Sequence, residues 1–201
     1  MSALLEQLNE EMAAVVEKAK RSLVQVHNGG YGVGAGTIWH PDGLIVTNAH
    51  VADRHALRVT LADGRSLSAR YLAHDHALDL AAIVVDAHDL PAIELGDSRT
   101  LRPGELVLAL GHPLGVTAAV TAGVVIGVGA EWPRMPPLQQ EWIAVDLPLR
   151  PGNSGGPLID ARGRLVGINT IMAGYHAGLA IPVHAAKLFL RQVLAPAGAA
   201  R

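Results

Sequence analysis

The sequence predicts an all-β protein of two six-stranded antiparallel β-barrels, with one helix before them and one after them. Three observations support this fold class. After residue 21, short runs rich in Val, Ile, Leu and Thr alternate with turn residues at a spacing of about 8–12 residues, as in sandwiches and barrels. The runs form two sets of six, separated by an irregular segment at 90–102. Half of the 201 residues are hydrophobic, so the chain is able to bury a large core.

Residues 1–21 are predicted to form an amphipathic helix, because leucines and valines recur there every three or four residues. Ser2 is placed to cap the start, acidic residues cluster early, and Lys18, Lys20 and Arg21 lie at the end, which suits the helix dipole. We expect the apolar stripe of this helix to pack on the domain or on another subunit.

The first barrel is assigned to 22–102 and the second to 103–183, with short glycine-containing turns between the strands. Strands of the first barrel are expected at 22–27, 34–39, 44–47, 57–61, 66–72 and 80–85. Strands of the second are expected at 106–110, 120–128, 142–145, 158–159, 165–171 and 179–181. The last part, 184–201, is assigned to a C-terminal helix that runs to residue 194 and a tail.

Composition narrows the partners and the compartment. A net charge of −2 argues against nucleic acid as the main partner. No apolar run reaches the ~18 residues of a membrane span. The absence of cysteine excludes disulfides and thiolate metal sites. The N-terminus lacks the features of a signal peptide. The sequence as given therefore indicates the cytoplasm, or the periplasm if a leader has been removed.

The stretch Arg-Pro-Gly-Asn-Ser-Gly-Gly-Pro at 150–157 surrounds one serine, Ser154, with three glycines and two prolines. This composition excludes a helix or a central strand and predicts a sharp turn with unpaired backbone N–H groups. Donors around a serine hydroxyl are what acyl transfer needs to hold a developing oxyanion. On this motif alone, a glycine-rich hairpin loop with an incidental serine is equally open.

A serine becomes a nucleophile when a base takes its proton and a third group orients the base. His50 is the candidate base, because it lies where an apolar strand ends. Asp79 is the candidate orienting acid, because apolar residues flank it on both sides. The chain order His50, Asp79, Ser154 is one of the known orders for this geometry, and it is the one found on a double barrel.

Two other interpretations fit less of the chain. The serine motif also satisfies the nucleophile elbow of α/β-hydrolases, but that fold needs a helix after the serine, and a β-rich run follows here. His74 and His76 have the spacing of two metal ligands, yet no further ligand is placed by the sequence, so no metal and no cofactor are expected. His112, before a proline, is expected to be a loop residue.

The chain resembles the trypsin-like (chymotrypsin-fold) serine proteases, specifically the protease domain of the HtrA family. The resemblance covers 22–183, which is then one protease domain, and the common order and spacing of the motifs make it specific. The motifs are Gly-Ala-Gly-Thr-Ile at 34–38, Thr-Asn-Ala-His-Val at 47–51, Leu-Asp-Leu-Ala at 78–81, Leu-Gly-Asp-Ser at 95–98, Gly-His-Pro-Leu-Gly at 111–115, Thr-Ala-Gly-Val-Val at 121–125, Pro-Gly-Asn-Ser-Gly-Gly-Pro-Leu at 151–158, Val-Gly-Ile-Asn-Thr at 166–170 and Leu-Ala-Ile-Pro at 179–182.

The resemblance implies a role for each matching residue. Ser154 would attack the peptide carbonyl, His50 would act as base and then as acid, and Asp79 would fix the imidazole. The backbone N–H groups of Gly152 and Ser154 would form the oxyanion hole, and Thr170 would support Asp79. Small or apolar residues would border the pocket for the residue before the cut: Ile168, Asn169, Ile171, Gly178 and Leu179.

The implied function is a serine endopeptidase of protein quality control, which cuts unfolded or flexible polypeptides after small aliphatic residues. The family assembles as trimers through its N-terminal segment, which the helix at 1–21 would provide. The chain ends about where many members begin a PDZ domain, so it is expected to be either a single-domain relative that lacks one or a truncated piece of a longer protein. A protease-shaped binding or scaffold protein of the chaperone type, with weak catalysis, is the alternative.

Two positions of the serine loop differ from related proteases. Arg150 replaces the usual Asn, which leaves the pocket shape and the order of this loop open. Asn153 stands where digestive relatives carry the Asp that pairs with a newly cut N-terminus, so activation by cleavage is not expected. Residues 131–141 are either a regulatory loop or a stiff surface loop.

Overall fold

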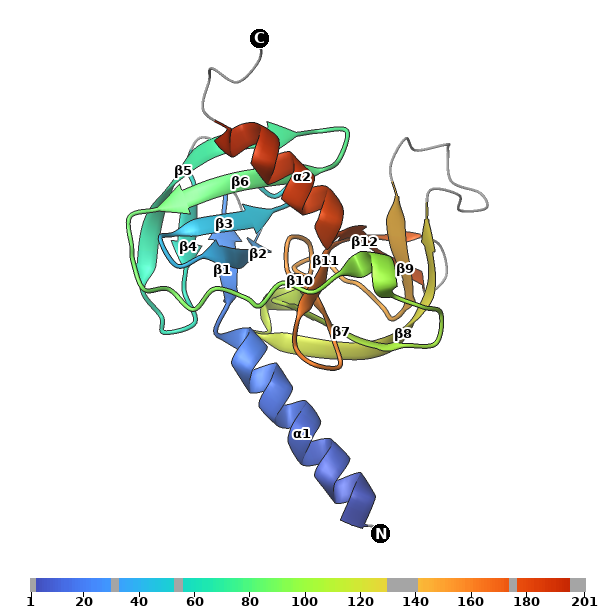
Figure 1. Ribbon diagram of the computed structural model, residues 1–201. Helices are drawn as coiled ribbons and strands as arrows, with labels where there is room; N and C mark the ends of the chain where they lie inside the picture. Colours follow the sequence, from blue (N-terminus) through green and yellow to red (C-terminus); the bar gives the residue numbers. More distant parts are fainter. Residues whose placement is uncertain (1–2, 30–32, 53–55, 130–140, 174–176, 196–201) are drawn as a thin grey trace.

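The computed structural model describes residues 3–29, 33–52, 56–129, 141–173 and 177–195. Within these ranges, twelve strands close into two six-stranded antiparallel barrels that lie side by side (Figure 1). Helix α1 (Ala3–Lys20) precedes the barrels and helix α2 (Val183–Leu194) follows them. The predicted fold class is confirmed. Residues 131–140 of the suggested loop lie outside the described residues.

The strands follow one another around each barrel in the same pattern. The first barrel has the spatial order β1-β2-β3-β6-β5-β4, and the second has the order β10-β11-β12-β9-β8-β7. The first barrel contains β1 (Leu23–His27), β2 (Val33–His40), β3 (Leu44–Thr47), β4 (Arg58–Thr60), β5 (Ser66–Asp75) and β6 (Leu80–Val85). The second contains β7 (Leu106–Gly111), β8 (Ala119–Gly129), β9 (Trp142–Asp146), β10 (Pro157–Asp160), β11 (Leu165–Ala173) and β12 (Ala177–Pro182).

Strand β5 is longer than the sequence predicts, because its pairing with β6 continues through Ala73, His74 and Asp75 although these residues show no apolar alternation. Two short 3₁₀ helices lie in the loops that the structure describes. One, η1 (Ser98–Thr100), lies in the connector between the barrels, and the other, η2 (Pro113–Gly115), follows β7.

Alternation along the strands divides the core into three clusters. On β6, Ala81 and Ile83 face the interior of the first barrel, whereas Leu80 and Ala82 face the seam between the barrels. On β7, alternate residues pack inside the second barrel or in the same seam. Because β6 and β7 are buried on both faces, their sequences are apolar throughout and do not alternate with polar residues. The cluster in the seam, called the seam cluster below, includes Leu80 and Ala82 of β6 and Leu108 and Leu110 of β7. It joins the two barrels into one body and so positions the candidate site.

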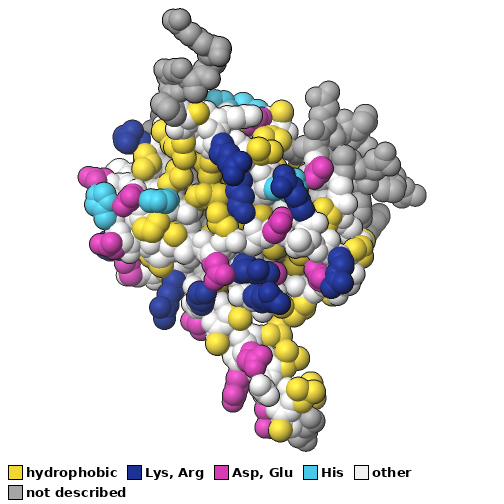
Figure 2. Space-filling model, viewed as in Figure 1, with side chains coloured by type: hydrophobic (Ala, Val, Ile, Leu, Met, Phe, Trp, Pro, Cys, Tyr) yellow, Lys and Arg dark blue, Asp and Glu magenta, His cyan; other side chains and the backbone are white. Residues whose placement is uncertain are grey.

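Helix α2 contacts strands of both barrels, β5 and β6 on one side and β11 and β12 on the other (Figure 1). The second half of α1 packs on the seam cluster through Met12, Val15, Val16 and Ala19. Its first half extends away from the barrels (Figure 1 and Figure 2). On this half, Leu5 and Leu8 are about half exposed, at 51% and 48%. No helix in the described ranges is long and apolar enough to cross a membrane.

Candidate active site

His50 and Asp79 come from two turns of the first barrel that lie next to each other. Nδ1 of His50 is 2.9 Å from both carboxylate oxygens of Asp79. The backbone N–H of His50 also donates to Oδ1 of Asp79, at 3.1 Å. Because the carboxylate accepts at Nδ1, the ring carries its proton there and Nε2 is left as the acceptor. The structure therefore brings the predicted base and its predicted orienting acid together.

Asp79 occupies a backbone conformation that few residues other than glycine adopt, with φ of 53°. Aspartate tolerates this region better than most side chains. The carbonyl of Asp79 accepts hydrogen bonds from the backbone N–H of Ala49 at 3.1 Å and from Nδ2 of Asn48 at 2.9 Å. These bonds fix the turn of Asp79 against the turn of His50.

Thr170 reaches the same carboxylate from the second barrel, where its Oγ1 donates to Oδ2 of Asp79 at 2.7 Å. The pairing of β11 with β12 contains one extra residue on β11 between Asn169 and Met172, and this bulge lies at Thr170. Partial burial alone would raise the pKa of Asp79, but the hydrogen bonds from His50 and Thr170 outweigh it and lower that pKa below the usual value. Asp79 is therefore ionised at neutral pH.

Ser154 lies in the loop before β10, and it is joined to both barrels. Its Oγ donates to the carbonyl of Thr170 at 2.9 Å. Its own carbonyl accepts from the backbone N–H of Ala35, on β2, at 2.8 Å. Thr170 consequently connects the three predicted residues: its carbonyl contacts Ser154, and its hydroxyl contacts the Asp79–His50 pair.

Residues 150–153 form a type II β-turn. The N–H of Asn153 donates to the carbonyl of Arg150 at 2.9 Å, proline is at the second position, and Gly152 at the third position has φ of +102°. The side chain of Asn153 closes the turn again, since its Oδ1 accepts from the N–H of Arg150 at 3.0 Å. Replacement of the usual Asn by Arg150 therefore does not prevent an ordered turn.

The turn is oriented by the segment after β7. The N–H of His112 donates to the carbonyl of Gly152 at 2.8 Å, and the N–H of Leu114 donates to the carbonyl of Pro151 at 3.3 Å. In a trans peptide the N–H points opposite to the carbonyl of the preceding residue, so the N–H of Gly152 points away from Leu114. His112 was expected to be a loop residue, and its place in the Gly-His-Pro-Leu-Gly motif at 111–115 did not predict this contact with the 150–153 turn.

The residues expected around the specificity pocket are mostly enclosed. Ile168, Asn169 and Leu179 are fully buried. The amide of Asn169 donates to the carbonyls of Leu110 and Pro157, so it ties β11 to the neighbouring strands. Gly178 is buried as well, and Ile171 belongs to β11. Their part in a substrate pocket stays a prediction.

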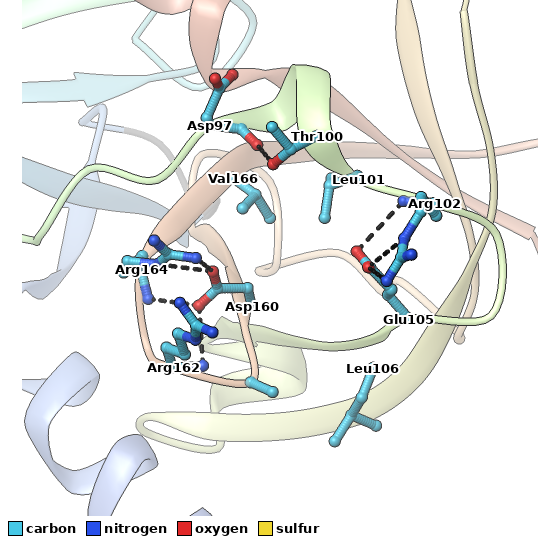
Figure 3. A pocket seen from close by; sticks show the side chains of 11 residues that line it. Asp97, Thr100, Leu101, Arg102, Glu105, Leu106, Asp160, Arg162, Arg164 and Val166 are labelled. Atoms are coloured by element: carbon cyan, nitrogen blue, oxygen red, sulfur yellow. Dashed lines mark hydrogen bonds and ion pairs between the residues drawn. The ribbon is translucent and has the colours of Figure 1, made fainter.

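The groove shown in Figure 3 lies elsewhere, between the connector and the turn from β10 to β11, with a volume of about 620 Å³. Its charged side chains are largely paired with one another: Arg102 with Glu105 at 2.8 Å, and Arg164 with Asp160 at 2.7 Å. The groove contains none of the three predicted catalytic residues. In the described part of the chain, no three His, Asp or Glu side chains gather as a metal site would need.

Comparison with known proteins gives consistent results. The family model of the trypsin-like peptidase domain matches residues 34–168. A putative serine protease HhoB of Synechocystis sp. is 38% identical over 161 residues, which are 78% of this chain and 39% of that protein. A probable periplasmic serine endoprotease DegP-like of Pseudomonas fulva is 42% identical over 139 residues, 69% of this chain and 29% of that protein.

Among solved structures, the HtrA-type protease AlgW with a tripeptide superposes with a TM-score of 0.84 at 33% identity, covering 92% of this chain and 64% of that one. The same protease with a decapeptide gives a TM-score of 0.82 at 28% identity, covering 90% and 67%. The chain thus spans less than half the length of these two sequence relatives.

Proposed function

This chain belongs to the trypsin-like peptidase family, and on that premise we propose that it is a serine endopeptidase that uses His50, Asp79 and Ser154. The observation that carries the proposal is the His50–Asp79 pair at 2.9 Å, joined to Ser154 through Thr170 across the seam. The relatives' names, serine protease and endoprotease, support the same activity. On this proposal, 22–183 is the protease domain, and 22–102 and 103–183 each supply one barrel.

In the proposed reaction, Nε2 of His50 takes the hydroxyl proton of Ser154 while Oγ attacks the peptide carbonyl. The hydroxyl donates to the Thr170 carbonyl in this structure, so it first turns about the Cα–Cβ bond toward His50. Asp79 stabilises the imidazolium and keeps its ionised form throughout. The imidazolium then gives the proton to the leaving amine, and an acyl ester remains on Ser154. Water repeats the sequence and releases the acid.

The oxyanion of the tetrahedral intermediate needs donors that are already in place. The type II turn supports the N–H of Gly152 as one donor. The carbonyl of Pro151 accepts from the N–H of Leu114 and the carbonyl of Gly152 accepts from the N–H of His112, so both peptide groups are held in orientation. The N–H of Ser154 is the second proposed donor. The reciprocal bonds between Arg150 and Asn153 hold this turn without any contact from a new N-terminus.

For substrates, we propose extended polypeptides that are cut after small aliphatic residues. The environment of Gly178 supports a narrow pocket, because a Cβ on this residue would lie 2.9 Å from Cγ of Leu149 and 3.0 Å from the carbonyl oxygen of Leu147. Unfolded or flexible proteins fit best, since a strand-like substrate must be free of its own fold to enter a cleft. Protein quality control is the corresponding cellular role.

Two further proposals concern assembly and compartment. The first half of α1 exposes Leu5 and Leu8 on a helix that extends from the barrels, which supports a homo-oligomer, a trimer, formed through this segment. Several relatives are named periplasmic endoproteases, and this supports the periplasm over the cytoplasm.

Labelling with a fluorophosphonate tests the activity directly. The native protein should be modified at Ser154, the denatured protein should not, and Ser154→Ala should abolish both labelling and cleavage of an unfolded protein. Ser98→Ala is the matched control, because Ser98 also lies beside a histidine, 2.8 Å from Nδ1 of His184, but is fully buried. A folded native protein that takes up no label would instead favour the scaffold function.

A further inference from the structure

The turn between β7 and β8 stores backbone strain next to the oxyanion loop. Leu114 and Ala118 both have positive φ, 54° and 52°, although neither is glycine. Such conformations cost about 1–3 kcal/mol each and persist where surrounding contacts hold them. The N–H of Leu114 is held by the carbonyl of Pro151, at 3.3 Å, and the N–H of Ala118 is held by Nδ1 of His112, at 3.2 Å.

His112 is 4% exposed, and Nδ1 of its ring faces two donors. One is the backbone N–H of Ala118 and the other is Nε2 of Gln25, on β1 of the first barrel, at 3.4 Å. A backbone N–H only donates, so Nδ1 accepts and the ring proton resides on Nε2. This arrangement requires a neutral imidazole, and it ties the turn to the opposite barrel.

The backbone of His112 meets the oxyanion loop directly. Its N–H donates to the carbonyl of Gly152 at 2.8 Å, and its carbonyl lies so close to Gly152 that a Cβ on Gly152 would overlap it. Backbone packed on backbone leaves no flexible side chain between the two segments to absorb a shift. A displacement of His112 must therefore displace the peptide of Gly152.

We propose that His112 is a positioning residue, whose neutral ring holds the 112–118 turn and thereby aims the N–H of Gly152 at the developing oxyanion. This inference rests on the proposed function, because it assigns Gly152 to the oxyanion hole. It adds a residue that contacts neither substrate nor Ser154 and that acts entirely through the backbone it supports.

The electrostatics of the ring agree with this geometry. Burial lowers the pKa of His112 to about 4 and outweighs a hydrogen bond with the backbone of Val24 that acts in the opposite direction. The nearby titratable side chain of His27, on β1, lowers the pKa further. The ring consequently stays neutral around pH 7, where the acceptor at Nδ1 is needed. Protonation of Nδ1 would place its hydrogen against the hydrogen of the Ala118 N–H, and this repulsion would release the turn.

Two substitutions separate the acceptor from the bulk of the ring. His112→Asn places Oδ1 near the position of Nδ1 and keeps an acceptor for Ala118, whereas His112→Leu keeps apolar volume and removes the acceptor. His184→Leu is the control, since it removes a histidine that is bonded to Ser98 in another part of the fold. We expect His112→Leu to lower kcat on the order of 10²-fold with KM within about twofold, and the other two to stay near wild type.

Binding measurements add a readout that a general loss of stability would not produce. Affinity for a peptide aldehyde, which forms a tetrahedral oxyanion on the enzyme, should fall in His112→Leu by about the same factor as kcat/KM. Affinity for the matching uncleaved peptide, measured in the Ser154→Ala background, should remain unchanged. Equal losses of affinity for both ligands would overturn the inference.

Hydrogen exchange tests the same support without any activity. Amides of the segment 150–156 should exchange at least tenfold faster in His112→Leu than in wild type, and at wild-type rates in His112→Asn and His184→Leu. If His112→Leu does not fold, His112→Phe replaces it, because phenylalanine keeps a ring and removes the acceptor, and an unchanged exchange rate in that variant refutes the support. A wild-type protein that neither cleaves substrate nor takes up fluorophosphonate overturns the proposed function instead. In that case hydrogen exchange still tests whether His112 supports the 112–118 turn and the segment 150–156.

Discussion

Thr170 donates a 2.7 Å hydrogen bond to Asp79 across the seam between the two barrels. The backbone carbonyl of the same threonine accepts a hydrogen bond from the hydroxyl of Ser154 at 2.9 Å. One residue of β11 therefore contacts the carboxylate of Asp79 from the first barrel and the hydroxyl of Ser154, the proposed nucleophile, from the second. The seam cluster sets how the two barrels are placed, and it thereby sets how the proposed catalytic groups are placed relative to one another.

Replacing Thr170 with Val should remove the donor to Asp79 while preserving the shape of the side chain. A hydrogen bond to a charged group contributes about 1.5–3 kcal/mol, so kcat should fall roughly 10- to 100-fold. Thr170→Ser keeps the hydroxyl and should stay near wild type. Steady-state kinetics on a peptide substrate checks this, and equal kcat values for the two variants would contradict it.

Asp79→Asn should lower kcat on the order of 10⁴-fold while the protein stays folded. An amide at this position donates a hydrogen to Nδ1 of His50, which forces the ring proton to Nε2 and removes the base. Circular dichroism confirms folding and single-turnover kinetics measures the step. Asp75→Asn is the matched control, because Asp75 ends β5 directly before the same turn and accepts hydrogen bonds from the N–H groups of Ala77 and Leu78. A loss in that control equal to the loss in Asp79→Asn would refute the assignment.

The lowered pKa of Asp79 also predicts how stability depends on pH. A carboxyl whose pKa is lower in the folded than in the unfolded protein stabilises the fold above the unfolded value, about 3.9, and loses that contribution as pH falls through the folded value. Urea denaturation between pH 5 and 2 should show a smaller decline in the free energy of unfolding for Asp79→Asn than for wild type. Parallel curves would count against the native hydrogen bonds of Asp79.

Gly155→Ala should destabilise the fold by at least about 2 kcal/mol. Gly155 has φ of +84°, and a Cβ there would overlap the carbonyl of Ala35 and Oγ1 of Thr47, both in the first barrel. Gly64→Ala isolates the backbone effect, because Gly64 has φ of +87° and open space around it. Thermal unfolding should show the larger loss at Gly155, and similar losses at both glycines would mean that the seam has room to adjust.

The joint substitution of Leu5 and Leu8 by Glu should convert the proposed oligomer to monomer without a loss of folding. Both side chains are half exposed on the part of α1 that extends from the barrels. Leu188→Glu on α2, where Leu188 is 49% exposed, is the control and should leave the mass unchanged. Light scattering measures the mass, and a monomeric wild-type protein would remove the basis of the assembly proposal.

The sequence alone determined the fold class and the segments of the fold. Apolar alternation, glycine turns and the six-and-six grouping predicted both barrels, because period-two burial and turn chemistry act over only a few residues. The predicted end of β5 was too early, since the pairing that extends it to Asp75 is supplied by the partner strand and not by its own residues. The family motifs likewise pointed to His50, Asp79 and Ser154, because each lies in a local pattern that is readable without neighbours.

Tertiary structure decided the contacts between segments that are distant in the chain. The bulge that brings Thr170 to Asp79, the bonds of His112 to Ala118 and Gly152, and the burial of Asn169 arise where two barrels and a turn meet. A histidine in a loop carries no local sign of burial, because its environment is built from strands up to 87 residues away. Consecutive residues encode which side chains are available for the proposed reaction. The distances between those side chains and their pKa values depend on how the two barrels pack.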